Sequence, residues 1–170
     1  MDFDVRSAEP ADTAALLAVE ADAAQLFGSV EGLEWLAGHV GSTPEDYLRL
    51  VTARTVWVVE NDVAIVGFLA ARVQRSDLHI VEVSVRREHQ RRGLARRLIP
   101  RAVDEARRRG LTALTLTTFR GLTWNEQLYS KLGFLTLDGE AIPPSLKREL
   151  DLDAAAGLPR ERRCAMRLHL

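Results

Sequence analysis

The alternation of apolar and polar residues along the chain predicts a series of short β-strands. Residues 3–7 alternate in the way that a half-buried edge strand does. Residues 55–60 are rich in β-branched and aromatic side chains, and the turn at Asn61-Asp62 joins them to a hairpin partner over 63–73. The same reasoning predicts four more strands, over 78–85, 114–118, 134–137 and 163–170.

Apolar residues three or four positions apart predict helices between these strands. A first helix is expected over 11–27, and a longer one over 93–109 with Gly110 as its natural stop. Ser42 or Thr43 before Pro44 is typical of a helix start, because a hydroxyl caps the first turn and proline suits its first position. Further helices are expected over 33–39, 124–132 and 143–156.

The order of these elements predicts an α/β fold with a mixed sheet. An antiparallel run of strands precedes strand–helix–strand units, and this order favours helices on both faces of the sheet. We expect a single domain over residues 1–170, since the sequence has the length of one domain and contains no internal repeat, low-complexity tract or linker.

Composition and charge exclude several classes of protein. The chain is 46% hydrophobic and 28% charged with a formal net charge of −1, whereas a general nucleic-acid-binding chain is basic overall. Its longest nearly apolar run, 63–71, is too short to span a bilayer, and its acidic N-terminus lacks the features of a signal peptide. We therefore expect a cytoplasmic protein with no membrane partner.

The cysteine and histidine content argues against a metal centre. Cys164 is the only cysteine, so the chain cannot form an intramolecular disulfide, and a thiolate metal cage is not expected. His39, His89 and His169 show no metal-ligand spacing. We predict that no metal is bound and that Cys164 is a small buried hydrophobe in the last strand rather than a nucleophile.

The most informative segment is a strand, a short loop and a helix start over residues 83–96. Gly93 and Ala95 are small residues at the start of the helix, where the first amides have no intrahelical partners. Together with the helix dipole these amides form an anion site that suits a pyrophosphate. Positive charge around it comes from Arg91, Arg92, Arg96 and Arg97. The alternative is an ordinary strand–helix connection whose arginine-rich helix is solvated.

Two motifs together resemble the GCN5-related N-acetyltransferase (GNAT) superfamily. Gln90, Gly93 and Ala95 match the Gln/Arg-x-x-Gly-x-Gly/Ala loop that follows the fourth strand in that superfamily. Its later helix, with Asn and Tyr before a Gly-Phe pair, is matched by Asn125, Tyr129, Gly133 and Phe134. The resemblance implies a GNAT-type mixed, mostly antiparallel central sheet of about seven strands, flanked by helices on both faces.

The resemblance implies that acetyl-CoA is the co-substrate. In such proteins the backbone of the fourth strand pairs with the pantetheine arm, and the matching residues here are Val83, Ser84 and Val85. The pyrophosphate is held along the loop and first helical turn, at Gln90, Arg91, Arg92, Gly93, Leu94, Ala95 and Arg96. Asn125 is expected to hydrogen-bond to the pantetheine side. Ala95 stands where glycine is common, and the family tolerates alanine there.

Acetyl transfer to an amine needs a base for the amine and an acid for the leaving thiolate. The resemblance assigns the acid to Tyr129, whose phenol can protonate the sulfur. The base is left open between His79 and Glu82 on the fourth strand and a water-relayed route. An ordinary imidazole is mostly neutral at cellular pH. Simple alternation places His79 and Glu82 on opposite faces of the strand, and a bulge would change this.

We therefore predict an N-acetyltransferase that transfers an acetyl group directly to a primary amine in a ternary complex, with a small molecule favoured over a protein as acceptor. The alternative is a non-catalytic acyl-CoA-binding sensor or regulatory module of the same fold. No nucleic-acid partner is expected, because the phosphates of CoA account for the ten arginines within 86–109. The acceptor's identity, the acyl-chain preference and the formation of a homodimer stay open.

The acidic first part of the chain bears on the acceptor. Residues 1–48 contain ten acids and one base, which favours a cationic amine. The candidates on the early helices are Glu20, Asp22, Glu31 and Glu34. Solvated helix faces are the alternative interpretation of these four residues.

Overall fold

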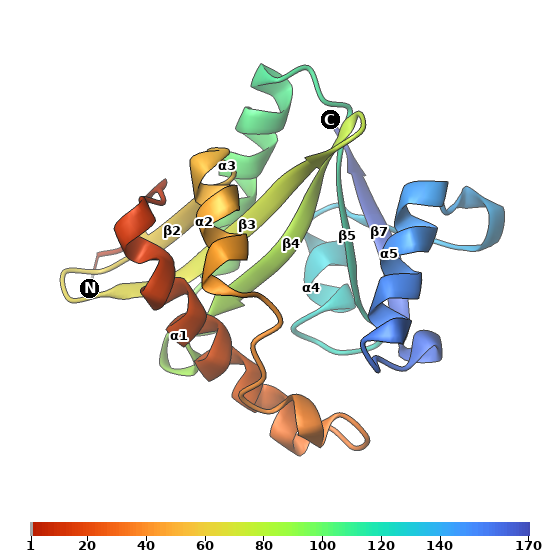
Figure 1. The fold of residues 1–170 in the computed structure, drawn as a ribbon, viewed down its shortest axis with the longest axis horizontal. Helices are drawn as coiled ribbons and strands as arrows, with labels where there is room; N and C mark the ends of the chain where they lie inside the picture. The colour runs from red at the N-terminus through yellow and green to blue at the C-terminus, as the bar shows by residue number, and fades with distance from the viewer. Residues whose placement is uncertain (1) are drawn as a thin grey trace. The chain divides into compact units, whose positions relative to one another are not determined.

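The computed structural model describes residues 2–170, which form one seven-stranded sheet and five α-helices (Figure 1). The strands are β1 (Asp4–Ser7), β2 (Val56–Glu60), β3 (Ile65–Gln74), β4 (Asp77–Val85), β5 (Ala113–Phe119), β6 (Leu135–Leu137) and β7 (Arg163–His169). The helices are α1 (Thr13–Ala24), α2 (Pro44–Thr52), α3 (Leu94–Arg108), α4 (Glu126–Lys131) and α5 (Pro144–Ala155). Within residues 2–170 none of the helices is long and apolar enough to cross a bilayer.

The strands follow the order β1-β2-β3-β4-β5-β7-β6 in the sheet. β4 and β5 are parallel, while the pairs β1–β2, β2–β3, β5–β7 and β6–β7 are antiparallel. The α/β fold with a mixed, mostly antiparallel sheet of seven strands is therefore confirmed.

The chain forms two compact units. The first comprises Met1–Arg72 and Val81–Glu105, and the second comprises Val73–Ile80 and Ala106–Leu170. Three elements, β3, β4 and α3, contribute residues to both units. The assignment of residues 1–170 to a single domain stays a prediction.

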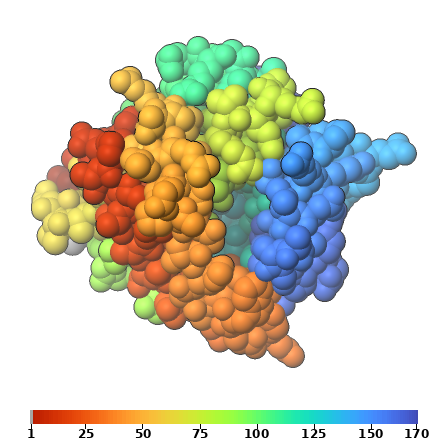
Figure 2. Space-filling view, viewed as in Figure 1, coloured from red at the N-terminus to blue at the C-terminus, as the bar shows by residue number. Residues whose placement is uncertain are grey.

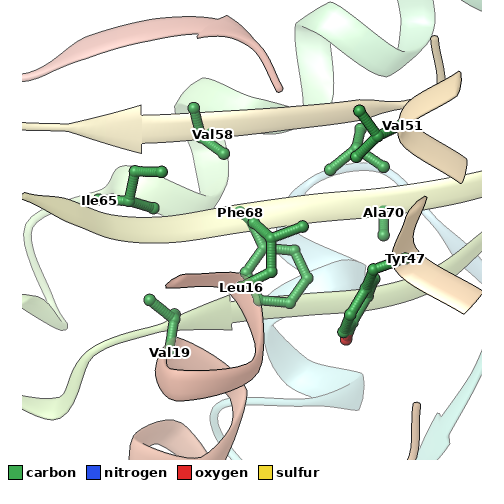
Figure 3. Packing of buried hydrophobic residues seen from close by; sticks show 9 residues of the cluster. Leu16, Val19, Tyr47, Val51, Val58, Ile65, Phe68 and Ala70 are labelled. Carbon is green, nitrogen blue, oxygen red and sulfur yellow. The ribbon is translucent and has the colours of Figure 1, made fainter. Parts of the chain in front are cut away.

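The core of the first unit forms where α1 and α2 pack on β2 and β3 (Figure 3). All four elements contribute to it, with Leu16, Val19, Val51, Val58 and Phe68. Residues 56–59 and 65–71 are buried without interruption, which requires that both faces of β2 and β3 are covered. On the surface, α1 and α2 lie side by side, in red and orange in Figure 2.

Helix α2 begins as the sequence predicts. The Thr43 hydroxyl accepts a hydrogen bond from the amide of Asp46 at 3.2 Å, and the Asp46 carboxylate accepts one from the Thr43 amide at 3.0 Å. Pro44 occupies the first helical position, where a missing N–H costs nothing. This reciprocal capping confirms the predicted start at Thr43.

The helix predicted over 33–39 is wrong. Only a short 3₁₀ helix, Glu34–Leu36, forms there. Gly32 and Gly38 have φ of +81° and +73°, and such left-handed glycines end helical hydrogen bonding on both sides of the segment. The helix predicted over 11–27 is α1 with a 3₁₀ helix at each end, Pro10–Asp12 and Gln25–Ser29.

In the second unit α5 packs on β5 and β7 (Figure 1). Leu146 and Leu150 lie one turn apart on α5 and form a buried cluster with Ala165 of β7. These contacts fix which face of α5 meets the sheet, and so which polar residues of the helix lie against the strands.

Candidate active site

The loop between β4 and α3 is built by two left-handed residues. A 3₁₀ helix, Arg87–His89, follows β4, and the side-chain Nε2 of Gln90 then donates to the Val85 carbonyl at 2.9 Å. Arg91 and Gly93 have φ of +62° and +73°. A Cβ at Gly93 would meet no atom within 4 Å, so it is the left-handed backbone that favours glycine there, with open space in front of it.

The N-terminus of α3 offers unused backbone donors. The amide of Arg97 bonds to the carbonyl of Gly93 at 3.2 Å, so the amides of Leu94, Ala95 and Arg96 come before the first helical bond of this segment. Exposed arginines nearby in sequence include Arg91, Arg92, Arg96 and Arg97. The arrangement has the donors and the charge that a pyrophosphate requires.

Other arginines of this region have structural partners within the first unit. Arg97 donates to the Phe3 carbonyl at 2.6 Å, and Arg101 donates to the Val5 carbonyl at 3.3 Å. Arg87 forms an ion pair with Asp22 at 3.2 Å. Arg97 therefore ties α3 to the residue directly before β1, and its expected contribution to the charge around the anion site stays a prediction.

In the part of β4 that lies in the first unit, Ser84 and Glu82 are linked. The Ser84 hydroxyl donates to the Glu82 carboxylate at 2.7 Å, and Ser84 is 5% exposed while Glu82 is half-buried. Residues two apart on a strand share a face, so this bond agrees with simple alternation at these two positions. Glu82 is therefore held in place by its own strand.

A second carboxylate of the first unit is buried. Glu20 is 6% exposed, and its two oxygens accept hydrogen bonds from the Tyr47 hydroxyl and, at 2.8 Å, from the Gly41 amide. Burial raises the pKa of Glu20, and these two hydrogen bonds oppose the shift. Burial, followed by the charges of Glu82 and Glu20, raises the pKa of Tyr47.

This arrangement changes the interpretation of the acidic residues on the early helices. Glu20 is part of a buried network, and Asp22 is paired with Arg87, so neither is a solvated helix face. Glu31 and Glu34 are exposed. The sequence pointed to Glu20 but not to Tyr47, whose place beside it depends on the packing of α2 against α1.

His79 lies in the second unit and is enclosed by polar groups. It is 3% exposed, and its Nδ1 lies 3.1 Å from the Thr115 hydroxyl of β5. Its Nε2 lies 3.9 Å from a carboxylate oxygen of Glu149 on α5. The other oxygen of Glu149 accepts a hydrogen bond from the Gln74 amide at 2.8 Å. Sequence reasoning did not identify Glu149, although it stands about one turn after the apolar Leu146 and directly before Leu150.

Asn125 is also in the second unit, directly before α4. Its side-chain oxygen accepts a hydrogen bond from the Thr118 hydroxyl at 2.7 Å, and its backbone carbonyl receives the amide of Tyr129 at 3.1 Å. The Nδ2 group is buried and has no hydrogen-bond partner among residues 2–170. Orphaned buried donors are rare in proteins, and this one fits a residue that awaits a polar ligand.

The Gly-Phe pair after α4 positions Tyr129. Gly133 has φ of +95°, and the amide of Phe134 returns to the Tyr129 carbonyl at 3.0 Å. The two rings meet edge to face with centroids 5.6 Å apart. Tyr129 is 8% exposed, so its ring is fixed by packing rather than free in solvent.

Cys164 is buried in β7, and burial raises the pKa of its thiol to about 11. Such a thiol is a poor nucleophile at neutral pH. No group of three or more His, Cys, Asp or Glu side chains within residues 2–170 is arranged to hold a metal ion.

The sequence profile of the acetyltransferase (GNAT) family matches residues 20–134, which is more than half of the chain. The chain therefore belongs to this family. The match includes the β4–α3 loop, Asn125, Tyr129 and the Gly-Phe pair. As a member of this family the chain is an N-acetyltransferase, and acetyl-CoA is the acetyl donor of the reaction.

Solved structures agree with the fold. The PaiA N-acetyltransferase of Thermoplasma acidophilum in complex with coenzyme A is similar with a TM-score of 0.77 and 13% identity, over 100% of both chains. YncA of Salmonella typhimurium with acetyl-CoA has a TM-score of 0.68 and 20% identity, over 100% of this chain and 95% of that one. The ribosomal-protein-S18-alanine N-acetyltransferase of Escherichia coli has a TM-score of 0.67 and 17% identity, over 99% and 94%.

Proposed function

We propose that the protein transfers the acetyl group of acetyl-CoA directly to a primary amine of a small molecule, in a ternary complex. The observation that carries the proposal is the start of α3, where the amides of Leu94, Ala95 and Arg96 precede the first helical bond. Directly before them, a Cβ at Gly93 would meet no atom within 4 Å. These donors, together with the arginines at 91, 92 and 96, suit the pyrophosphate of acetyl-CoA.

The remaining cofactor contacts are assigned from the family motifs. The backbone of Val83, Ser84 and Val85 pairs with the pantetheine arm. Gln90 binds the Val85 carbonyl through its own amide, so its role is to shape the loop that presents Arg91 and the following amides. Asn125 donates its orphaned amide hydrogens to the pantetheine side, which supports its assignment.

In the proposed reaction the neutral amine attacks the thioester carbonyl, and the C–S bond breaks after the tetrahedral intermediate forms. Tyr129 donates its phenolic proton to the leaving sulfur, so that CoA departs as a thiol rather than a thiolate. The packing of its ring against Phe134 supports this role, because a general acid must be held in a fixed position. Bulk water then restores the phenol.

We assign the general base to His79. Its Nε2 lies 3.9 Å from a carboxylate oxygen of Glu149, and a negative charge there favours the protonated imidazole that base catalysis produces. Glu82 is the alternative base, supported by its half-burial and its bond from Ser84. Substitution distinguishes the two, because only loss of the true base lowers kcat by a factor of roughly 10² or more.

A ternary complex is favoured over an acyl-enzyme. The single cysteine, Cys164, is buried with a raised thiol pKa, so it does not suit a covalent acetyl carrier. Proximity and orientation of the amine and the thioester supply much of the acceleration in a direct transfer.

The test is a matrix of initial rates in which acetyl-CoA and a primary amine are both varied. Intersecting double-reciprocal lines are expected for direct transfer in a ternary complex. Parallel lines would contradict it, because they indicate an acyl-enzyme. Calorimetry with acetyl-CoA accompanies the assay, and tight binding without turnover on a broad amine panel would instead indicate an acyl-CoA sensor.

A further inference from the structure

A layer of polar side chains lies between α5 and the strands of the second unit. Glu149 and Asp153 are four residues apart on α5 and therefore share one face of the helix. Asp153 forms an ion pair with Arg163 of β7 at 2.9 Å. Glu149 contacts Gln74 of β3 and His79 of β4. Both carboxylates of this helical face thus meet strand residues rather than solvent.

The strand register shows which charged groups face His79. His79 is opposite Thr115, and Thr115 is opposite Arg167, so their three side chains lie on one face of the sheet. Asp77, two residues before His79 on β4, shares this face and forms an ion pair with Arg167 at 3.1 Å. The charges of Asp77 and Arg167 therefore neutralise each other. Those of Asp153 and Arg163 do the same one helical turn further along α5. Glu149 is the carboxylate of this layer that faces an imidazole.

We propose that Glu149 acts through His79, whose imidazole it makes more basic by its negative charge. The inference rests on the proposed function, in which His79 is the base. Glu149 itself is fixed by the hydrogen bond from Gln74, and its side chain is 13% exposed, so its charge is poorly screened by water. A negative charge at this distance stabilises the imidazolium relative to the neutral ring.

The geometry assigns a task to each ring nitrogen. Nδ1 is within hydrogen-bond distance of the Thr115 hydroxyl, at 3.1 Å, and donates to it in the tautomer that leaves Nε2 as the basic nitrogen. The 3.9 Å between Nε2 and Glu149 is too long for a hydrogen bond, so Glu149 acts on the ring through its charge. Nε2 takes the proton released by the acetylated amine, directly or through water, and Glu149 stabilises the positive charge that results.

The test combines two readouts on the wild-type protein and four variants. Histidine NMR titration follows the pKa of His79, whose signals are identified by their loss in His79→Gln. Glu149→Gln removes the charge while keeping the size, and it should lower the pKa of His79 by roughly one unit. The apparent pKa of the acid limb in the profile of kcat/KM against pH should fall by the same amount. On the plateau, kcat should fall by roughly three- to tenfold because the base is weaker.

A matched control lies on the same helix face. Asp153→Asn removes a carboxylate of the same layer, whose partner is Arg163. It should lower stability but leave the pKa of His79 and the pH profile unchanged. Glu149→Asp keeps the negative charge, so the pKa of His79 in this variant should lie close to its wild-type value. This variant separates the effect of charge from that of packing if Glu149→Gln folds poorly.

Each failure has a different meaning. An unchanged His79 pKa in Glu149→Gln, or an equal shift in Asp153→Asn, would overturn the role of Glu149 and leave the acetyl transfer intact. Wild-type kcat in His79→Gln would overturn the base assignment and the inference with it. Absence of turnover in the wild-type protein would overturn the proposed function itself.

Discussion

The Tyr47 hydroxyl donates a hydrogen bond to Glu20 over 2.5 Å in the interior of the first unit. The other carboxylate oxygen of Glu20 accepts from the Gly41 amide, so one side chain of α1 holds both α2 and the connection before it. Because Tyr47 also packs edge to face on Phe68, this polar contact lies directly on the hydrophobic core. The network thus joins α1, α2 and the connection before α2, which the sequence pattern predicts only as separate elements.

Tyr47→Phe should destabilise the protein by roughly 2 kcal/mol. The phenylalanine fills the same space against Phe68, so the loss comes from the buried Glu20 oxygen left without its donor. Denaturant unfolding measures the change. Thr52→Ala is the control, because it removes an exposed hydroxyl from the same helix, and it should stay within about 0.5 kcal/mol of wild type. Equal stability of Tyr47→Phe and wild type would contradict the account.

Glu20→Gln should change the pH dependence of stability. Burial raises the pKa of Glu20 in the folded state above the ordinary value of 4.5, so the folded protein binds this proton more tightly than the unfolded chain does. The contribution of Glu20 to the free energy of unfolding therefore falls as pH rises from 4.5 towards the folded-state pKa. The difference between wild type and Glu20→Gln, measured by unfolding at a series of pH values, should show this fall. A difference that is independent of pH would refute it.

Gly93→Ala should weaken acetyl-CoA binding by about tenfold, which corresponds to about 1.4 kcal/mol. A φ of +73° is unfavourable for alanine because of its Cβ. The backbone would therefore shift, and the amides of residues 94–96 would turn away from the pyrophosphate. Gly110→Ala is a matched control beyond the other end of α3, with φ of +70° and equally open space at its Cβ. Both variants should lose about 1 kcal/mol of stability, and calorimetry should find normal affinity only in Gly110→Ala. Equal affinities in the two variants would remove Gly93 from the cofactor site.

Tyr129→Phe should lower kcat by roughly 10²-fold and leave the dissociation constant of acetyl-CoA nearly unchanged. The ring and its contact with Phe134 are retained, so the change is confined to the loss of the phenolic hydroxyl. Steady-state kinetics and calorimetry on the same preparation separate the two effects. A wild-type kcat would show that another group, or water, protonates the sulfur.

The elements of the fold followed closely from local chemistry. The cap at Thr43, the proline after it and the left-handed Gly110 after α3 each act through neighbours in sequence, so their signals are visible in the chain itself. The absence of the helix predicted over 33–39 also has a local cause. Its apolar spacing suggests a helix, but the backbone demands of Gly32 and Gly38 override that spacing.

The candidate site could be predicted only where a motif is local. The β4–α3 loop and the Asn-Tyr-Gly-Phe segment each lie within a few turns of chain, and the structure gives them the strained loop, orphaned amide and packed ring described above. Glu149 could not be found in this way. Its meeting with His79 depends on the register of β4 and β5 and on the face of α5 that Leu146 and Leu150 bury.

The charge pattern was informative about α3 and misleading in part about α1. Arg97 and Arg101 lie in the arginine-rich segment, and their guanidinium groups also donate to the carbonyls of Phe3, directly before β1, and of Val5 within it. Asp22 lies in the acidic segment, yet it pairs with Arg87. The distribution of charge along a sequence predicts the long-range electrostatic potential of a segment. It does not predict the partner of each side chain, which depends on tertiary contacts.

The most direct test of the central claim is a product assay with the purified chain. Acetyl-CoA is supplied with a panel of primary amines that includes small monoamines, polyamines, amino acids and peptides, and each reaction is followed by thiol release and mass spectrometry. The account predicts release of free CoA in step with an N-acetylated small amine, and the loss of that product in Tyr129→Phe. Acetyl-CoA binding without an acetylated product from any amine would contradict it.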